Sequence, residues 1–457
     1  MTDNKERLGT EPVGRLLLSL ALPTVVAQLI NMLYNLVDRI YIGHMPGDGD
    51  LALTGVGVCM PIILVVSAFA ALVSTGGAPR ASIFMGKKDT DTAEKILGGC
   101  FTLQIGISIV LTAVLLIWNR DFLLLFGASE NTIEYAVAYM NTYAVGTVFV
   151  QLTLGMNAFI TAQGFTRVSM LSVIIGAVTN IILDPIFIFA LDMGVQGAAL
   201  ATIISQALSC VWVVSFLCGK KTLLKLKREN FFASPKIVLP CVALGIAAFI
   251  MQSSESVINV CFNSSLLKYG GDLAVGAMTI STSVMQLAML PLQGISQGAQ
   301  PILSYNYGAG NAARVEKTFK LLLASCLTFS VTLWACVMGF PRVFASIFTP
   351  DAALLDFSVR AMRVYLGAMF IFGIQIACQM TFVSMGNAVS SVIVAVVRKF
   401  VLLLPLIYIM PHLIADPTMG VYAAEPAADV IAVTFTAVLF FFQFRKSMRN
   451  IQKSAEV

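Results

Sequence analysis

The sequence Asn31-Met32-Leu33-Tyr34-Asn35-Leu36-Val37-Asp38 places polar residues inside a long apolar segment that begins near residue 13 and ends near residue 41. In a helix these polar residues share one face, because they follow one another at spacings of three and four residues. An aspartate inside a membrane-spanning helix costs roughly 2.5–3.5 kcal/mol to insert, so it normally faces a helix bundle or a wet cavity. Asp38 is therefore a candidate functional residue. The alternative is a helix-end carboxylate that reaches the membrane surface beside Arg39.

The composition around this segment is that of a membrane protein. Of 457 residues, 58% are hydrophobic and 12% are charged, whereas soluble domains carry about 25% charged residues. The mean hydropathy is +0.86. The nine cysteines form no C-x-x-C pair, and the two histidines are His44 and His412. We therefore expect no disulfide framework, no zinc site and no histidine-based catalytic centre. The polar first fourteen residues do not fit a cleaved signal peptide.

Twelve apolar segments are long enough, at about 20 residues each, to span a bilayer. They lie near residues 15–43, 51–84, 95–118, 132–161, 168–190, 194–218, 237–267, 272–305, 316–339, 355–384, 388–411 and 426–445. The sequence thus predicts an all-α polytopic membrane protein with twelve transmembrane helices. We expect it in the plasma membrane, with the lipid bilayer as its surroundings.

Lysine and arginine gather in alternate loops, which predicts the orientation, because such loops remain in the cytoplasm. The basic set consists of Lys87, Lys88, Lys95, Arg167, Lys220, Lys221, Lys225, Lys227, Arg228, Arg314, Lys317 and Lys320. Both termini are also basic, and the opposite loops hold little beyond Arg120, Lys268 and Arg342. We therefore expect both termini in the cytoplasm and a basic cytoplasmic linker at residues 219–236.

The two halves of the chain resemble each other when one is shifted along the other by a constant offset of 222 in the numbering. The matching pairs are Pro79 and Pro301, Gly86 and Gly308, Glu94 and Glu316, Lys95 and Lys317, Tyr143 and Tyr365, and Gly164 and Gly386. Six helices per half is an even number, so both halves begin on the same side of the membrane and the repeat is parallel. We expect six-helix lobes at residues 1–218 and 237–457 around a central cavity, which is the architecture of a transporter.

A second acidic group lies in the fifth span, where Asn180 and Asp184 are four residues apart and Pro185 follows. Pro185 cannot donate to the carbonyl of Ile181, which leaves a bare acceptor near the carboxylate. Together with Asp38, Tyr34 and a hydroxyl from Thr202, these residues would form an oxygen-rich cluster for ion coupling. Such a cluster suits a proton shared by two carboxylates or a Na⁺ ion held by Asp38, Asn180, Asp184 and Thr202. The alternative is an aspartate at a helix end near the outer surface.

In the second half, Glu255 is the one acid that the predicted spans clearly contain. It is a candidate contact for a cationic substrate, unless it is a structural glutamate bonded to hydroxyls such as that of Ser254. Neutral and soft side chains that would complete a substrate site are Gln286, Gln293, Gln375, Asn157, Met60 and Met285. Arg398 and Lys399 fall inside the eleventh span, which is costly. Either that helix starts later, or Arg398 reaches the surface or pairs with an acid.

The segment from Leu292 to Gly310, with its Gln300-Pro301 pair and its Asn306-Tyr307-Gly308-Ala309-Gly310 turn, resembles the eighth helix of the multidrug and toxic compound extrusion (MATE) family. The resemblance extends over the whole chain and is closest to the bacterial branch that includes a staphylococcal efflux pump. It implies two lobes in a V and cation-coupled antiport of amphipathic, often cationic, drugs. It also assigns Asp38, Asn180, Asp184 and Thr202 to a first-lobe ion network and Glu255 to a second-lobe acid. Gln375 and Gln379 stand where some relatives carry an aspartate, which favours coupling in the first lobe.

The expected function is therefore a secondary multidrug exporter that works by alternating access, with H⁺ or Na⁺ as coupling ion and no other cofactor. The alternative is a flippase for a lipid-linked precursor, although such anionic substrates would favour a basic cavity. An ATP-driven pump lacks support, because no G-x-x-x-x-G-K-[ST] loop occurs. We expect no enzyme activity and no nucleic-acid partner. The expected ligands are small-molecule drugs or organic cations, and the expected assembly is a monomer.

Overall fold

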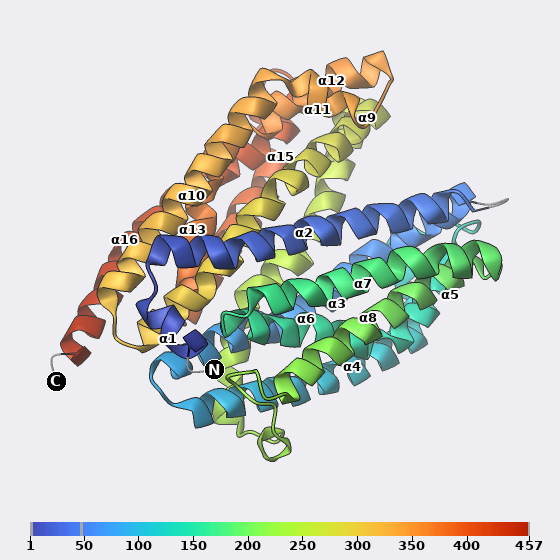
Figure 1. Cartoon of the computed structure of the whole chain (residues 1–457). Coiled ribbons are helices and arrows are strands. Elements are labelled where there is room, and N and C mark those ends of the chain that lie inside the picture. Colours follow the sequence, from blue (N-terminus) through green and yellow to red (C-terminus); the bar gives the residue numbers. More distant parts are fainter. Residues whose placement is uncertain (1–2, 46–48, 456–457) are drawn as a thin grey trace.

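The computed structural model describes residues 3–45 and 49–455, and the secondary structure of these residues is entirely helical (Figure 1). The first half contains α1 (Asp3–Thr10), α2 (Val13–Gly43), α3 (Gly49–Gly86), α4 (Thr90–Leu125), α5 (Ile133–Val145), α6 (Thr147–Ala162), α7 (Thr166–Pro185), η1 (Ile186–Ala190) and α8 (Gly194–Cys218). A connection with one short 3₁₀ turn, η2 (Arg228–Asn230), leads to the second half. That half contains α9 (Pro235–Gly308), α10 (Ala312–Gly339), α11 (Pro341–Ser346), α12 (Ala352–Tyr365), η3 (Met369–Ile371), α13 (Phe372–Ser384), α14 (Ala388–Val396), η4 (Val397–Leu403), α15 (Leu404–Leu413) and α16 (Pro417–Ala455).

These helices form twelve membrane spans in the described part of the chain. Nine helical stretches are long and apolar enough to cross a bilayer, and two bent pairs, 133–162 and 352–384, add one span each. The α9 stretch of 74 residues would be about 111 Å long if it were straight, far more than a bilayer needs. It is divided at Gly271, whose φ of 64° lies in the left-handed region that favours glycine. We call residues 235–270 and 272–308 the first and second arms of α9, and together they bring the total to twelve.

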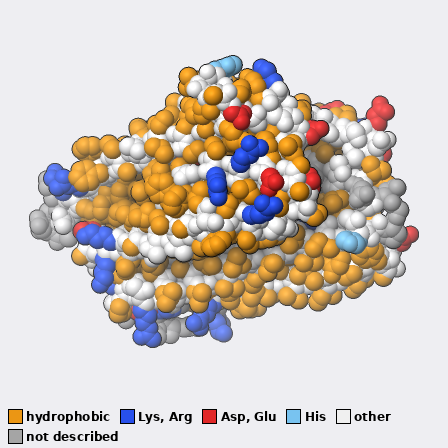
Figure 2. All heavy atoms as spheres, turned by 90° about the horizontal axis from the view of Figure 1, so that it is seen from above, with side chains coloured by type: hydrophobic (Ala, Val, Ile, Leu, Met, Phe, Trp, Pro, Cys, Tyr) orange, Lys and Arg blue, Asp and Glu red, His pale blue; other side chains and the backbone are white. Residues whose placement is uncertain are grey.

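The spans form two lobes that diverge from one end of the molecule, as the sequence predicts (Figure 1). One buried apolar core links α3, α5 and α8 of the first lobe, and another links α9, α12 and α16 of the second lobe. Hydrophobic side chains cover most of the face seen in Figure 2. Large apolar residues such as Leu125, 78% exposed, and Leu18, 68% exposed, are therefore placed for contact with lipid.

The lobes contact each other at glycines, and these contacts involve equivalent residues of the two halves. A Cβ atom on Gly86 of α3 would lie 2.0 Å from the carbonyl oxygen of Tyr305 in the second arm of α9. A Cβ atom on Gly308 would lie 1.9 Å from the carbonyl oxygen of Ile83. Residues 83 and 86 correspond to residues 305 and 308 at the offset of 222. Each lobe thus presents the same backbone surface to the other, which confirms the parallel internal repeat.

The contact between the first and second spans of opposite lobes follows the same rule. Gly76 faces the carbonyl of Cys241, where a Cβ would lie only 1.8 Å from the oxygen, and the equivalent Gly298 faces Ala21. A Cβ on Gly245 would lie 1.7 Å from the carbonyl oxygen of Leu72. The hydroxyl of Thr24 adds a hydrogen bond of 2.6 Å to the carbonyl of Gly294 across the lobes. Such approaches need residues without a side chain, so this interface depends on its glycines.

Two expectations about the spans need correction. The last helix begins at Pro417, not near residue 426, so Glu425 lies inside it. The fourth and tenth spans are broken, bending by 57° and 45° next to Gly146 and Gly367. Periodicity alone could not reveal these breaks, because the apolar run continues through each of them.

Gly76→Ala tests the contact between the lobes. A methyl group at this position would overlap the Cys241 carbonyl, so we expect the lobes to separate there. Cys241 is fully buried, and separation would expose its thiol. In detergent-solubilised protein with Cys241 as its sole cysteine, Gly76→Ala should be labelled by a maleimide severalfold faster than the parent.

The matched control is Gly57→Ala in the same helix, because a Cβ at Gly57 would meet no atom of the described chain within 4 Å beyond its own helical backbone and its two chain neighbours. Both variants should elute as a single folded species in gel filtration. Equal labelling of the two variants would show that the glycine contact does not hold the lobes together.

Candidate functional site

Four polar side chains from three helices meet inside the first lobe. Asp38 of α2 is 7% exposed, and Asp184 of α7 is fully buried. Their carboxyl groups are adjacent. The amide nitrogen of Asn180 donates to Asp184 Oδ1 at 3.1 Å and lies 3.5 Å from the Thr202 hydroxyl of α8. Four of the residues that were predicted from the sequence for ion coupling therefore lie together. We call Asp38, Asn180, Asp184 and Thr202 the first-lobe cluster.

The first-lobe cluster contains oxygen atoms without partners. Asp38 Oδ1, Asn180 Oδ1 and Asp184 Oδ2 are buried and accept no hydrogen bond from a donor in the described part of the chain. Native proteins seldom leave buried polar atoms unsatisfied, so each of these atoms is a candidate to bind a water, an ion or a proton. Neither aspartate forms an ion pair with a described residue. Two adjacent buried carboxylates cannot both stay charged cheaply, so the donor set fits a shared proton or one hard monovalent cation.

Tyrosines surround this cluster, although only one of them was predicted. Tyr34 of α2 lies near both Asp38 and Asp184. Tyr139 of α5 interacts with Asp38 and with the hydroxyl of Thr202, and no sequence pattern singled it out. Asn35 is exposed, and its amide bonds to the carbonyl of Asn31 at 2.6 Å. The polar stripe of the first helix thus contributes Asp38 to the cluster and Tyr34 to its surroundings, while the Asn35 side chain contacts Tyr34 and the backbone of its own helix.

The backbone next to the first-lobe cluster is irregular. Pro185 ends α7, and the five residues of η1 that follow form a π-helix. Proline removes one helical donor, and single π-turns inside helices frequently occur at functional sites. The fifth span of the second lobe also contains a π-helix, η4, which carries Arg398 and Lys399. The same span therefore contains a π-helix in both lobes, directly after Asp184 and Pro185 in the first lobe and around Arg398 and Lys399 in the second.

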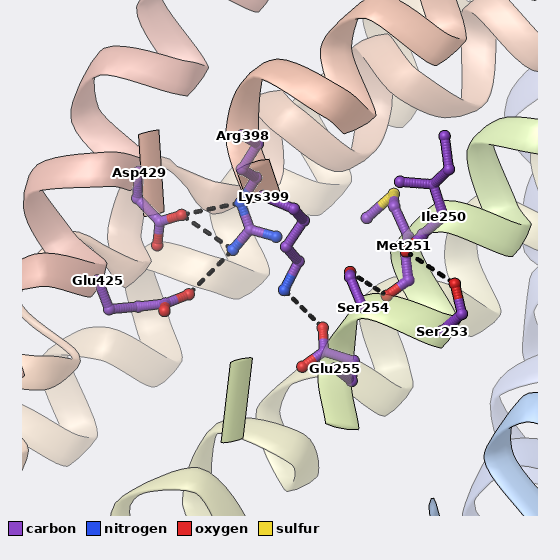
Figure 3. Close-up of polar contacts among 9 residues, drawn as sticks. All are labelled: Ile250, Met251, Ser253, Ser254, Glu255, Arg398, Lys399, Glu425 and Asp429. Carbon is purple, nitrogen blue, oxygen red and sulfur yellow. Dashed lines mark hydrogen bonds and ion pairs between the residues drawn. The ribbon is translucent and has the colours of Figure 1, made fainter. Parts of the chain in front are cut away.

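A second group of charges lies inside the second lobe (Figure 3). Arg398 Nη2 lies 2.9 Å from Asp429 Oδ1 and 3.2 Å from Glu425 Oε1, and all three side chains are 5% exposed. The guanidinium also lies over the ring of Phe372, 4.6 Å from its centroid. Lys399 Nζ contacts Glu255 Oε1 at 2.6 Å. We call Glu255, Arg398, Lys399, Glu425 and Asp429 the second-lobe network.

This network overturns part of the sequence analysis. Glu255 is not the only acid within a span of the second lobe, because Glu425 and Asp429 lie inside α16. The boundary drawn at residue 426 left Glu425 outside the predicted span, and Asp429 lay inside that span but was not recognised as a site residue. A spacing of four residues between two acids in an apolar segment was the available signal. Arg398 pairs with these acids, which decides among the alternatives left open for it.

The predicted substrate residues are dispersed. Gln286 and Gln293 are exposed on the second arm of α9, whereas Gln375 is buried in α13 with its Oε1 unpartnered. The Asn157 amide donates to the carbonyl of Ser169 at 3.4 Å. Met60 and Met285 pack against the apolar cores of different lobes. No hydrogen bond joins any two of these six described side chains, so a common substrate role for them stays a prediction.

Comparisons with known proteins agree with this architecture. The chain is 23% identical over 436 residues to "Multidrug export protein MepA" of Staphylococcus haemolyticus, covering 95% of each chain. It is 22% identical over 399 residues to the MepA protein of Staphylococcus aureus strain NCTC 8325, covering 87% of each.

Solved structures show the same fold. A MATE transporter in complex with MaL6 superimposes with a TM-score of 0.89 at 22% identity, covering 99% of this chain and 100% of the other. A MATE transporter of the MOP superfamily in an outward-facing conformation gives a TM-score of 0.88 at 22% identity, covering 98% of each chain. The MatE family profile matches residues 23–186 and 247–409, most of both lobes. With twelve spans in two equivalent lobes and this match over more than half of its length, the chain belongs to the MatE family of membrane transporters.

Proposed function

We propose that this protein exports amphipathic, mainly cationic compounds from the cell in exchange for a proton or a sodium ion. The observation that carries the proposal is the set of three unpartnered oxygen atoms in the first-lobe cluster. They offer an exchangeable cation a site without a competing ion pair. The curated relatives named multidrug export proteins support the class of substrate.

Charge supports a cationic substrate. The first-lobe cluster carries two carboxyl groups and no cation of its own, and the second-lobe network has three carboxylates against two cations. Glu255 is half-exposed, at 47%, and one of its oxygens is bound by Lys399. Its other oxygen is therefore placed to receive a cationic group. A flippase for anionic lipid-linked precursors would gain little from this excess of negative charge.

The proposed orientation places the basic end, with both termini and the 219–236 linker between the lobes, in the cytoplasm. The glycine contacts near Gly86 and Gly308 lie beside Lys87 and the turn at residues 309–311. They would then close the cytoplasmic side, while the lobes diverge toward the outside. The protein would act as a monomer in the plasma membrane.

In this mechanism, ion binding and substrate release are coupled through the first helix. α2 carries Asp38 near its C-terminal end and contacts the second lobe near its middle, where Thr24 and Gln28 bond to Gly294 and Gln297. A proton or Na⁺ that reaches Asp38 and Asp184 from outside neutralises the cluster and displaces the substrate. The inward transition must break the Thr24 and Gln28 bonds and separate the glycines. The ion then leaves to the cytoplasm, and a new substrate binds. One monovalent ion exchanged for one monovalent cation moves no net charge.

Asp38→Asn should abolish coupled transport, because the cluster loses the charge that an incoming cation neutralises. In proteoliposomes, ethidium efflux driven by a pH step or a Na⁺ step should fall to the level of protein-free vesicles. The matched control is Asp121→Asn, the same substitution at an exposed aspartate of α4, which should transport normally. Unchanged efflux in Asp38→Asn vesicles would remove the first-lobe cluster from the mechanism.

Wild-type vesicles separate the two coupling ions and the two substrate classes. We expect one of the two steps, applied alone, to drive ethidium efflux, and the effective step identifies the ion. If neither step moves ethidium while a fluorescent lipid-linked saccharide crosses the bilayer, the flippase alternative is correct.

A further inference from the structure

The second-lobe network occupies the position in its lobe that the first-lobe cluster occupies in the other. The cluster joins the first, fifth and sixth spans of its lobe, α2, α7 and α8. The network joins the seventh, eleventh and twelfth spans, which are the first arm of α9, the η4 region and α16. These are the same three helices of the repeat, so the polar groups of both lobes mark one architectural position.

Individual residues correspond to within about one helical turn. Pro185 and Pro405 are equivalent at an offset of 220. At this offset Asn180 corresponds to position 400, which is next to Lys399 in the sequence. The Met-Gly-Val sequences at 193–195 and 419–421 correspond at an offset of 226, and they set Thr202 beside Asp429. In the first span of each lobe, Asp38 corresponds at the offset of 220 to position 258, which is less than one helical turn from Glu255.

The two positions differ in where their positive charge comes from. Asp38 and Asp184 have no ion-pair partner among the described residues, and each keeps an unpartnered oxygen. In the second lobe, the equivalent span provides Lys399, which is 4% exposed and donates to Glu255 at 2.6 Å. The Lys399 ammonium also lies near Glu425. A covalently attached monovalent cation therefore sits where the first lobe has bare oxygens.

We propose that Lys399 is a tethered cation that fills the second-lobe counterpart of the ion site, so that only the first lobe exchanges an ion. The inference rests on the proposed function of the first-lobe cluster. It follows that removing the ammonium creates a site for a small monovalent cation, either Na⁺ or an alkylammonium ion. Glu255 would bind that ion, and Glu425 would add to its attraction.

The test compares the cation dependence of thermal stability in purified proteins that all carry Asp38→Asn, which removes the first-lobe response. The parent Asp38→Asn and the double variant Asp38→Asn/Lys399→Ala are melted at constant ionic strength. N-methylglucamine chloride, whose cation is much larger than Na⁺, serves as the reference salt and is replaced stepwise by sodium or n-propylammonium chloride. We expect a saturable rise in Tm of about 2 °C or more in the double variant and none in the parent.

Adding Glu255→Gln to the double variant should abolish this rise, because the carboxylate that binds the cation is gone. Lys399→Arg should behave like the parent, since it keeps a tethered cation. A Lys399→Ala protein whose Tm ignores both cations would overturn the proposal. A second result would also overturn the proposal. In it, the Lys399→Ala protein does not fold in any of the cations, whereas the Glu255→Gln/Lys399→Ala protein folds normally.

The outcomes distinguish this inference from the proposed function. Failure of the first-lobe assignment appears in the efflux experiment, as unchanged ethidium efflux from Asp38→Asn vesicles, and it does not depend on Lys399. Failure of the tethered-cation proposal appears only in the comparison made within the Asp38→Asn background. If no Lys399 variant can be purified, the ion-to-substrate ratio of the wild type decides, because two ions per monovalent substrate would contradict a single exchanging lobe.

Arg398 should behave differently from Lys399, because it is bonded to two buried acids at once. Arg398→Met leaves Glu425 and Asp429 without a partner, and such breaks are strongly destabilising. We expect little folded protein by gel filtration, with no recovery in alkylammonium salts. Arg342→Met, which removes an exposed pair with Asp356, should melt like the wild type. Normal folding of Arg398→Met would contradict a structural role for this pair.

Discussion

Buried charge in a membrane protein must be neutralised, and this requirement explains most of what is unusual in the two lobes. Asp38, Asp184, Glu255, Glu425 and Asp429 all lie within spans that are otherwise apolar. Each carboxylate must be protonated, bind a cation or pair with a basic side chain. In the first lobe no basic side chain of the described residues pairs with the carboxylates, whereas in the second lobe Arg398 and Lys399 pair with them. In the proposed mechanism, the first-lobe position is the one that responds to an external ion gradient.

The repeat supplies the scaffold on which this difference can arise. Equivalent glycines bring the lobes to backbone contact at Gly86 and Gly308, and equivalent spans carry the polar groups. In the proposed mechanism, a transporter of this kind needs two features. One is an interface between the lobes that can separate, and the other is a charged site whose ion occupancy controls that separation. α2 connects the two, because Asp38 and the Thr24 bond to Gly294 belong to one continuous helix. The state of the cluster and the state of the interface can therefore influence each other.

The sequence predicted the features that depend on local pattern. Apolar length indicated the twelve spans, and internal matches indicated the repeat. The cost of a buried carboxylate singled out Asp38 and Asp184. Features that depend on which helices touch could not be read in this way. Tyr139 looked like any tyrosine in an apolar run, and the pairing of Lys399 with Glu255 joins residues 144 positions apart. Pro426 was taken as a helix boundary, although α16 runs through it.

If one lobe exchanges an ion and the other carries its own cation, substrate binding should release a single ion. This can be measured by counting the cations that purified wild-type protein releases when it binds a monovalent organic cation such as ethidium. Proton release can be measured by calorimetry in buffers of different ionisation enthalpy, and sodium release with radioactive sodium. We expect a total of one cation released per ethidium bound. Release of two would mean that both lobes exchange ions, and release of none would mean that substrate and ion do not compete.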